Sequence, residues 1–300
     1  SFGLLKLMEG TPVSQQITDA FVQDYRGTVI QLAQQKGSRL RGAVTVHTDV
    51  TGKTDFFDRV GATTAQIKTT RHGDTPLIET PHSRRMASLA CYEWADLIDK
   101  SDKVRTLIDP EGEYAKAGGW GLGRAMDDVI ITAMTGTAAT GETGSGSQAL
   151  PSAQKIAEAS TGLTIAKLRE AKRILDASEI DPSDPRFFLA SAVQIDDLLA
   201  TTAVTSSDFN TVKALVHGEV DTFLGFKFIR TQRLNTTAAS VRGCIAFSKA
   251  SIGLSIGMEI IARITERADK SYAVQPYMAM DLGSVRVEDE GVVEVSCRES

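Results

Sequence analysis

The sequence has little of what most catalytic, metal-binding or membrane proteins need. It holds 4 histidines, 3 cysteines and 2 tryptophans in 300 residues. No two histidines are spaced i, i+3 or i, i+4, so the sequence offers no pair of metal ligands on one helix face. Its longest apolar runs fall far short of the roughly 20 residues that a membrane-spanning helix requires. These absences argue against a metalloenzyme and against a membrane-spanning protein.

The cysteines are also too few and too scattered for a disulfide framework. Cys91, Cys244 and Cys297 are odd in number and form no C-x-x-C pair. We therefore expect reduced, buried thiols rather than a disulfide or a metal site.

A surplus of positive charge is missing as well. The chain has 33 basic and 38 acidic residues, a net charge of −5, and both signs are spread along its length. Proteins that hold nucleic acid by neutralising phosphates usually carry a basic patch or tail. If this protein surrounds DNA, we expect it to act as a wall rather than as a clamp.

The first third of the chain reads as an arm followed by an unusual hairpin. Apolar residues recur every three to four positions from Val13 to Leu32, which predicts a helix that ends at Gly37. Residues 42–80 have a strand composition but very few large apolar side chains. An isolated hairpin with so little to bury is marginal in water, so this stretch needs another surface to lie on.

The remainder mixes helices and strands without regular alternation, which predicts an α+β fold. The clearest helix runs from Asp109, as N-cap, to Gly136, and its glycines at 118, 119, 121 and 123 predict close approach of another backbone. Residues 136–160 are small and polar and predict a flexible loop. We expect further helices at 164–177 and 191–199, strands at 85–94, 187–190, 244–247, 259–265 and 272–280, and hairpins pairing 219–223 with 226–230 and 284–287 with 292–297.

Several short motifs suggest chemistry, but each lacks its context. Gly52-Lys53-Thr54 resembles the end of a phosphate-binding loop, yet His47 stands where the first glycine is needed. The run from Gly253 to Gly257 matches the G-x-S-x-G nucleophile elbow around Ser255, but no histidine follows His217 in the chain. Asp127 and Asp128 are neighbours that point to different sides of a helix, and solvated faces explain them. We therefore expect no catalytic residue, no cofactor and no metal.

The order of elements resembles a known family. An arm, a long polar hairpin, a long strand, a long glycine-containing helix, a mixed domain and returning C-terminal strands look like the Hong Kong 97-type major capsid protein of tailed bacteriophages. Its most specific pieces here are the segment 218–230 (GEVDTFLGFKFIR), similar to the family's hairpin before the late strands, and the segment 278–286 (MAMDLGSVR) followed by Val292–Val295, similar to its closing strands.

The resemblance implies a division of the chain and a set of partners. Residues 1–40 would form an N-terminal arm, 41–84 an extended loop, 85–145 with 270–300 a peripheral domain around a long spine helix, and 146–269 an axial domain. The protein would pack with itself as hexamers and pentamers of an icosahedral shell in the virion, assembled in the host cytoplasm. The shell would enclose double-stranded DNA without reading its sequence, and portal, scaffolding and cement or decoration proteins would be further partners.

The extended loop supplies the candidate interface residues. Its charges are mixed, which suits a polar contact with a neighbouring subunit, and the residues selected are Lys53, Asp55, Lys68, Arg71, Arg84 and Arg85. Two other functions stay open at this point. An encapsulin-like compartment would use the same fold around enzymes, and a serine hydrolase would use Ser255.

Overall fold

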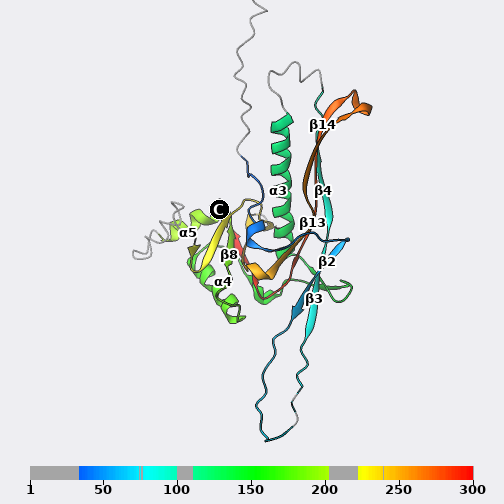
Figure 1. The fold of residues 1–300 in the computed structure, drawn as a ribbon. Coiled ribbons are helices and arrows are strands. Elements are labelled where there is room, and N and C mark those ends of the chain that lie inside the picture. Colours follow the sequence, from blue (N-terminus) through cyan, green and yellow to red (C-terminus); the bar gives the residue numbers. More distant parts are fainter. Residues whose placement is uncertain are drawn as a thin grey trace, which may run out of the picture.

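The computed structural model describes residues 34–73, 75, 77–99, 111–202, 222–238 and 240–299. The predicted helix of the arm and the predicted start of the long helix at Asp109 lie outside the described residues. In Figure 1 a long helix stands beside a long sheet, and a mixed domain lies to the left of them. An extended loop projects from the lower end of the molecule.

The long sheet is the backbone of the molecule. It has four strands in the order β1-β13-β14-β4. Their bounds are Thr45–His47 for β1, Ala90–Ala95 for β4, Ile252–Arg267 for β13 and Ala273–Arg286 for β14. Helix α3 (Glu111–Thr135) runs along this sheet and shares a core with it, because Leu122, Met126 and Ile130 on the helix and Met280 and Leu282 on β14 are all buried in one cluster. We call the four-stranded sheet the spine sheet.

The mixed domain is built on a second, seven-stranded sheet. Its path is β7-β15-β12-β8-β10-β9, and β11 pairs with β12. The strands are β7 (Lys155–Ile156), β8 (Arg186–Ala190), β9 (Thr222–Phe223), β10 (Phe226–Arg230), β11 (Thr236–Ala238), β12 (Val241–Ser248) and β15 (Val292–Arg298). Every residue of β8 is buried, which fits a central strand with covered faces.

Within its described residues this domain has two α-helices, and their starts follow from the sequence. Helix α4 (Ile165–Ala177) begins after Thr164, whose hydroxyl accepts from the Lys167 backbone N–H at 3.3 Å. Helix α5 (Ala192–Thr202) begins after Ser191, whose backbone N–H donates to the Gln194 side chain at 3.1 Å, as in a capping box. Both predicted helices are confirmed.

The predicted hairpin about Leu224-Gly225 is also confirmed. β9 and β10 pair antiparallel, and both turn residues have positive φ, 52° for Leu224 and 85° for Gly225. This is the turn that matches the twist of two neighbouring strands.

A third, small sheet carries the extended loop. Its order is β2-β3-β5-β6, with β2 at Thr54–Val60, β3 at His82–Ser88, β5 at Ala138–Thr140 and β6 at Gly146–Gln148. β2 and β3 form a hairpin, as predicted for this region, but its second strand lies at His82–Ser88, beyond the predicted stretch 42–80, and residues 61–81 contain no strand among their described residues. The prediction of a flexible loop over 136–160 is wrong, because β5 and β6 extend the hairpin's sheet there.

Among the described residues the short connections contain four 3-10 helices, and two ladders shift register: β11 with β12 between Thr236 and Ala238, and β13 with β14. The 3-10 helices are η1 (Arg41–Ala43), η2 (Ser152–Gln154), η3 (Lys249–Ser251) and η4 (Ala268–Lys270). The ladder between β13 and β14 shifts register between Ile256 and Ile261.

Two strand predictions need correction because local pattern does not determine pairing. The stretch 85–94 is not one strand: β3 ends at Ser88, Leu89 donates its N–H to the Lys53 carbonyl at 2.9 Å, and β4 then enters another sheet. The last two strands do not form a hairpin either, since β14 pairs with β13 and β4 while β15 pairs with β12 and β7.

Sheet membership also differs from the predicted domain borders. β13 falls in the predicted axial stretch but pairs with β14 in the spine sheet, and β15 falls in the predicted peripheral stretch but lies in the seven-stranded sheet. The chain therefore crosses between the two sheets more often than a division by sequence position allows.

The cysteine expectation is partly wrong. All three thiols are free, and Cys244 and Cys297 are buried as expected, but Cys91 is exposed on β4. Among the described residues there is no helix long and apolar enough to cross a membrane and no group of three or more His, Cys, Asp or Glu side chains suited to a metal ion.

Candidate subunit interface

The extended loop is joined to the spine sheet through one carboxylate. β1 pairs parallel with β13 so that His47 lies opposite Ser255. Asp55, at the start of β2, accepts a hydrogen bond from the Ser255 hydroxyl at 2.6 Å, and the same oxygen lies 2.9 Å from His47 Nδ1. Asp55 therefore ties the base of the loop to two strands of the subunit's own sheet.

Phe57 adds an apolar contact at the same place. Its ring stacks on the His47 ring with 4.2 Å between centroids, and it is only 6% exposed. On its other side the ring covers Gly253 so closely that a Cβ there would lie 2.4 Å from Phe57 Cζ. A glycine at 253 is thus a condition for seating the loop, and we call the contacts of His47, Asp55, Phe57, Gly253 and Ser255 the loop root.

The geometry of Ser255 does not support the hydrolase alternative. Ser255 lies inside the long strand β13 rather than on a sharp turn between a strand and a helix, and it is fully buried. The structure does bring a histidine nearby, from upstream in the chain, which sequence order had left out. However, the Ser255 hydroxyl donates to Asp55 and not to His47, so no base faces the hydroxyl as in a catalytic triad.

A second junction holds the loop from the other side. Arg286, at the end of β14, is completely buried and donates to the carbonyls of Met134, Gly136 and Gln148 at 3.0, 2.6 and 2.9 Å. Its Nε donates to Asp289 at 2.6 Å. One side chain thereby joins the end of α3, β6 and the turn before β15.

Arg85 shares the same carboxylate. Its Nη2 donates to Asp289 at 2.6 Å, and its side chain is only 8% exposed. Burial lowers the pKa of the Arg85 guanidinium, and the negative charge of Asp289 opposes that shift. Arg85 was predicted to face a neighbouring subunit, but this geometry places its charge inside its own subunit.

The other predicted interface residues occupy different parts of the loop. Lys53 is exposed at the turn before β2, and Lys68 and Arg71 are exposed on the far part of the loop. Arg84 pairs with Asp58 across the hairpin at 2.8 Å while both stay largely exposed. For Lys53, Lys68, Arg71 and Arg84 an interface role stays a prediction, whereas Asp55 and Arg85 are engaged within the subunit.

An open cavity of about 640 Å³ lies beside the hairpin where β2, β3 and β5 meet. Its lining carries both signs of charge, from Asp58, Arg59, Arg84, Arg85 and Glu142. A mixed, solvent-open hollow of this kind suits polar side chains of another protein better than an apolar ligand.

A contact without a signal in the sequence pattern holds the end of the arm against α3. Asp127 was expected on a solvated helix face, and this is wrong because its side chain is fully buried. It accepts from the Ser38 hydroxyl at 2.6 Å and from the backbone N–H groups of Arg39 and Leu40, each at 3.1 Å. We call this contact the arm clamp.

The glycines of α3 explain how the clamp closes. A Cβ on Gly123 would lie 2.5 Å from the Gly37 Cα, and one on Gly118 would lie 2.4 Å from the Trp94 ring. The predicted close approach of another backbone is therefore confirmed at Gly123, whereas the close neighbour of Gly118 is a side chain. At Gly121 the prediction is wrong, because the nearest atom to an added Cβ is the Arg124 guanidinium at 3.7 Å.

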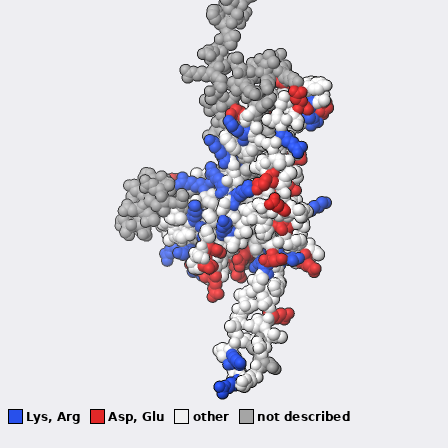
Figure 2. Space-filling view, in the orientation of Figure 1, with Lys and Arg blue, Asp and Glu red and all other residues white. Residues whose placement is uncertain are grey.

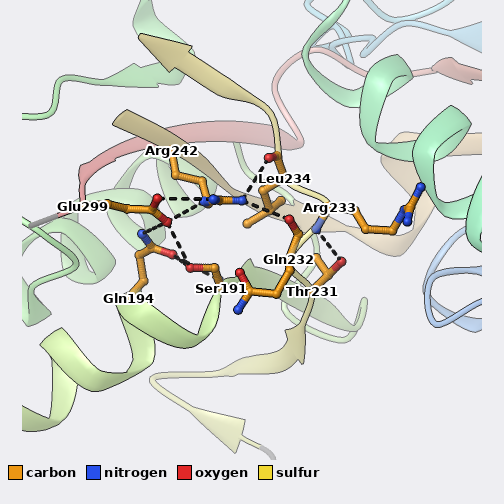
Figure 3. Close-up of polar contacts among 8 residues, drawn as sticks. All are labelled: Ser191, Gln194, Thr231, Gln232, Arg233, Leu234, Arg242 and Glu299. Carbon is orange, nitrogen blue, oxygen red and sulfur yellow. Dashed lines mark hydrogen bonds and ion pairs between the residues drawn. The ribbon is translucent and has the colours of Figure 1, made fainter. Parts of the chain in front are cut away.

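The C-terminal end of the described chain is held by a polar network on the seven-stranded sheet (Figure 3). Arg242 donates to both carboxylate oxygens of Glu299, and Gln194 donates to the same carboxylate at 3.2 Å. The hydrogen bonds from Arg242 hold the pKa of the Glu299 carboxyl below its ordinary value. Arg242 also donates to the carbonyls of Gln232 and Leu234, so the network fastens the chain after β10.

Comparison with known proteins identifies the relatives of this architecture. A family model described as phage capsid protein matches residues 17–299. A search of curated protein sequences returns no match.

Solved phage capsids share the fold despite low sequence identity. The capsid structure of the cyanophage P-SCSP1u has a TM-score of 0.71 at 18% identity, covering 99% of this chain and 97% of that chain. The capsid asymmetric unit of the cyanophage Pam1 has a TM-score of 0.70 at 13% identity, covering 94% and 97%. The capsid of the Ralstonia phage GP4 has a TM-score of 0.71 at 10% identity, covering 99% of both chains. These likenesses confirm the predicted α+β fold of the Hong Kong 97 type.

Proposed function

Because this chain belongs to the phage capsid protein family, we propose that its subunits assemble as hexamers and pentamers of an icosahedral shell and that the far part of the extended loop makes the contact between neighbours. The family is one of structural proteins, and the chain is a major capsid subunit. Enclosed double-stranded DNA, a portal, scaffolding proteins and decoration proteins complete the proposal as partners.

The observation that carries the proposed contact is the exposure of apolar side chains on the loop. Ile67 is 89% exposed and Leu77 is 94% exposed, and both belong to the extended loop that projects from the molecule (Figure 1). Within the described chain, residues 61–81 form no strand. Single exposed apolar residues are ordinary, but an entire projecting segment without its own core is stabilised by burial on a partner.

The anchoring of the loop supports this role. The loop root fastens one strand of the hairpin to the spine sheet, and Arg85 fastens the other strand to Asp289. A hairpin held on both strands presents its far part in a defined direction, which lowers the conformational entropy lost when a neighbour binds it.

Heterologous contact between identical subunits accounts for a shell. The projecting part of the loop and the body that receives it are different surfaces, so each subunit both gives and accepts a contact. Repetition of such a contact around an axis closes a ring, and rings of five and six close a shell.

The experiment replaces two apolar side chains on the far part of the loop and leaves the loop root unchanged. We expect Ile67→Ser with Leu77→Ser to leave a folded subunit that no longer forms particles in negative-stain microscopy. Ile67→Val with Leu77→Met is the matched control, because it keeps the apolar surface, and it should still assemble. Normal shells from the serine variant would remove the far part of the loop as the contact. A wild-type protein that stays monomeric at high concentration would contradict the assembly proposal itself.

A further inference from the structure

Basic side chains gather where the end of the arm crosses α3. Figure 2 shows Lys and Arg grouped over the middle of this face. Arg39 donates to the Arg230 carbonyl, and Arg124 of α3 donates to the Gln34 side chain at 2.8 Å. Arg233 extends from the chain after β10 toward α3 (Figure 3), where it pairs with Asp128. Segments that are far apart in sequence therefore bring their cations to one place.

Three basic side chains at this crossing, Lys36, Arg39 and Arg124, contact only neutral groups in the described part of the chain. The Lys36 ammonium lies 5.4 Å from the centre of the Trp120 ring. The Arg39 guanidinium donates to a carbonyl, and the Arg124 guanidinium donates to the side-chain oxygen of Gln34 and to the Gln35 carbonyl. We call Lys36, Arg39 and Arg124 the arm-crossing patch.

The carboxylates around the patch already accept hydrogen bonds or form ion pairs with other groups of the subunit. Asp127 is buried and accepts from the Ser38 hydroxyl and from backbone N–H groups. Asp128 pairs with Arg233 and raises the pKa of that guanidinium through their hydrogen bonds, and Glu259 pairs with Arg41. Among the described residues Asp127 has only neutral hydrogen-bond donors and keeps its negative charge, so the three cations of the patch face this one carboxylate and the patch retains a surplus of positive charge.

We propose that the arm-crossing patch binds the phosphate backbone of double-stranded DNA and that this face of the subunit is therefore turned toward the interior of the shell. The inference rests on the proposed function, in which the shell encloses a DNA genome. Guanidinium groups match phosphate geometry, and an ammonium adds a point charge. The patch combines basic side chains from two segments, which suits sequence-independent contact with phosphates.

The strength of one patch is modest, but a shell repeats it. Three phosphate contacts predict a slope of about −3 in the logarithm of the binding constant against the logarithm of salt concentration. Raising the salt fourfold should therefore weaken binding by about fortyfold. Many patches on one inner surface act together on a single DNA molecule, so weak single contacts add up to firm binding.

The test measures binding of a short fluorescent DNA duplex to unassembled subunits by anisotropy at several salt concentrations. In the Lys36→Gln, Arg39→Gln variant we expect about tenfold weaker binding and a salt slope that falls to about −1. The clamp should survive, because Asp127 holds the backbone N–H of Arg39 and not its side chain. The matched control is Lys172→Gln with Arg173→Gln on α4, which removes the same charge elsewhere and should bind like the wild type.

Closed shells test the orientation. Duplex DNA added from outside should bind unassembled subunits but not closed wild-type shells, since closure hides an inward face. Equal binding by free subunits and closed shells would overturn the inward orientation. Wild-type affinity in the Lys36, Arg39 variant, or an equal loss in the α4 control, would overturn the patch as the DNA contact.

Two further outcomes separate this inference from the proposed function. Tighter binding of a poly-glutamate peptide than of duplex DNA at equal charge would favour an acidic protein segment as the occupant and overturn the DNA assignment. Normal shells with no DNA affinity would remove only this inference, whereas the absence of any shell would count against the proposed function while the subunit measurement still tests the patch.

Discussion

The root and the far part of the extended loop are one continuous stretch of chain with opposite physical characters. At the root, Phe57 is 6% exposed and Asp55 bridges two strands of the spine sheet. On the far part, Ile67 is 89% exposed and Lys68 and Arg71 are exposed as well. The root thus belongs to the fold of the subunit, while our proposal gives the far part its role in the assembly. Mutations should separate the two along this line.

The largest effect on the free energy of unfolding is expected at the second junction of the loop. Arg286→Met removes the fully buried cation that donates to three main-chain carbonyls and to Asp289, and we expect a loss of about 3–5 kcal/mol in urea unfolding. Arg84→Met is the control, because its pair with Asp58 is exposed and contributes about 0–1 kcal/mol. Similar losses in both variants would mean that burial does not distinguish the two arginines.

A smaller loss is expected at the root itself. Gly253→Ala places a methyl group against the Phe57 ring, and overpacking of this kind costs about 1–3 kcal/mol. Gly42→Ala, where an added Cβ meets nothing within 4 Å, should change stability by less than about 0.5 kcal/mol. A Gly253→Ala variant that melts at the wild-type temperature and still assembles would show that the packing of the Phe57 ring does not require a glycine at position 253.

In the mixed domain, we expect the free energy of unfolding to fall in acid through the polar network around Glu299. The folded-state pKa of Glu299 is lowered by Arg242, so its contribution to stability is complete above the ordinary glutamate pKa and is lost as the pH falls through the lower, folded value. We expect the urea midpoint of the wild type to fall more steeply in acid than that of Glu299→Gln. Parallel pH profiles for the two proteins would argue that this carboxylate is not linked to folding.

The smallest effect on folding and the clearest effect on assembly are expected from the far part of the loop. Lys68→Glu with Arg71→Glu should leave urea unfolding unchanged within about 0.5 kcal/mol while particles disappear from micrographs. Arg84 is left unchanged, because it pairs with Asp58 in its own hairpin. A destabilised subunit would place these charges in the fold, and normal particles would exclude them from the contact.

Local signals in the sequence predicted the elements whose cause is itself local. The helices that start at Thr164 and Ser191 and the turn at Leu224-Gly225 depend on residues only a few positions apart, and all three are confirmed. The composition of residues 42–80 also predicted correctly that the hairpin lies partly on another surface, which is the spine sheet at its root.

Long-range pairing could not be read in the same way. A strand pattern gives the faces of a strand but not its partner, which is why β14 and β15 were paired with each other incorrectly. The sequence places Arg85 among the charges of the loop, and only the fold shows that it pairs with Asp289. In the same way, Asp127 has the pattern of a surface residue, and only the fold shows that the arm covers it. The arm-crossing patch was missed for the same reason, since Lys36 and Arg124 are far apart in sequence and only the fold gathers them.

The long ladder between β13 and β14 has a mechanical consequence for a shell under load. The two strands pair antiparallel from Ile252 opposite Arg286 to Arg267 opposite Ala273. Hydrogen bonds in such a ladder lie perpendicular to the strands, so a pull along the strands loads many of them together in shear instead of opening them one after another. The exception is the irregular register between Ile256 and Ile261, where the ladder is interrupted. Under tension the spine sheet should therefore resist as a unit and yield first at that irregularity.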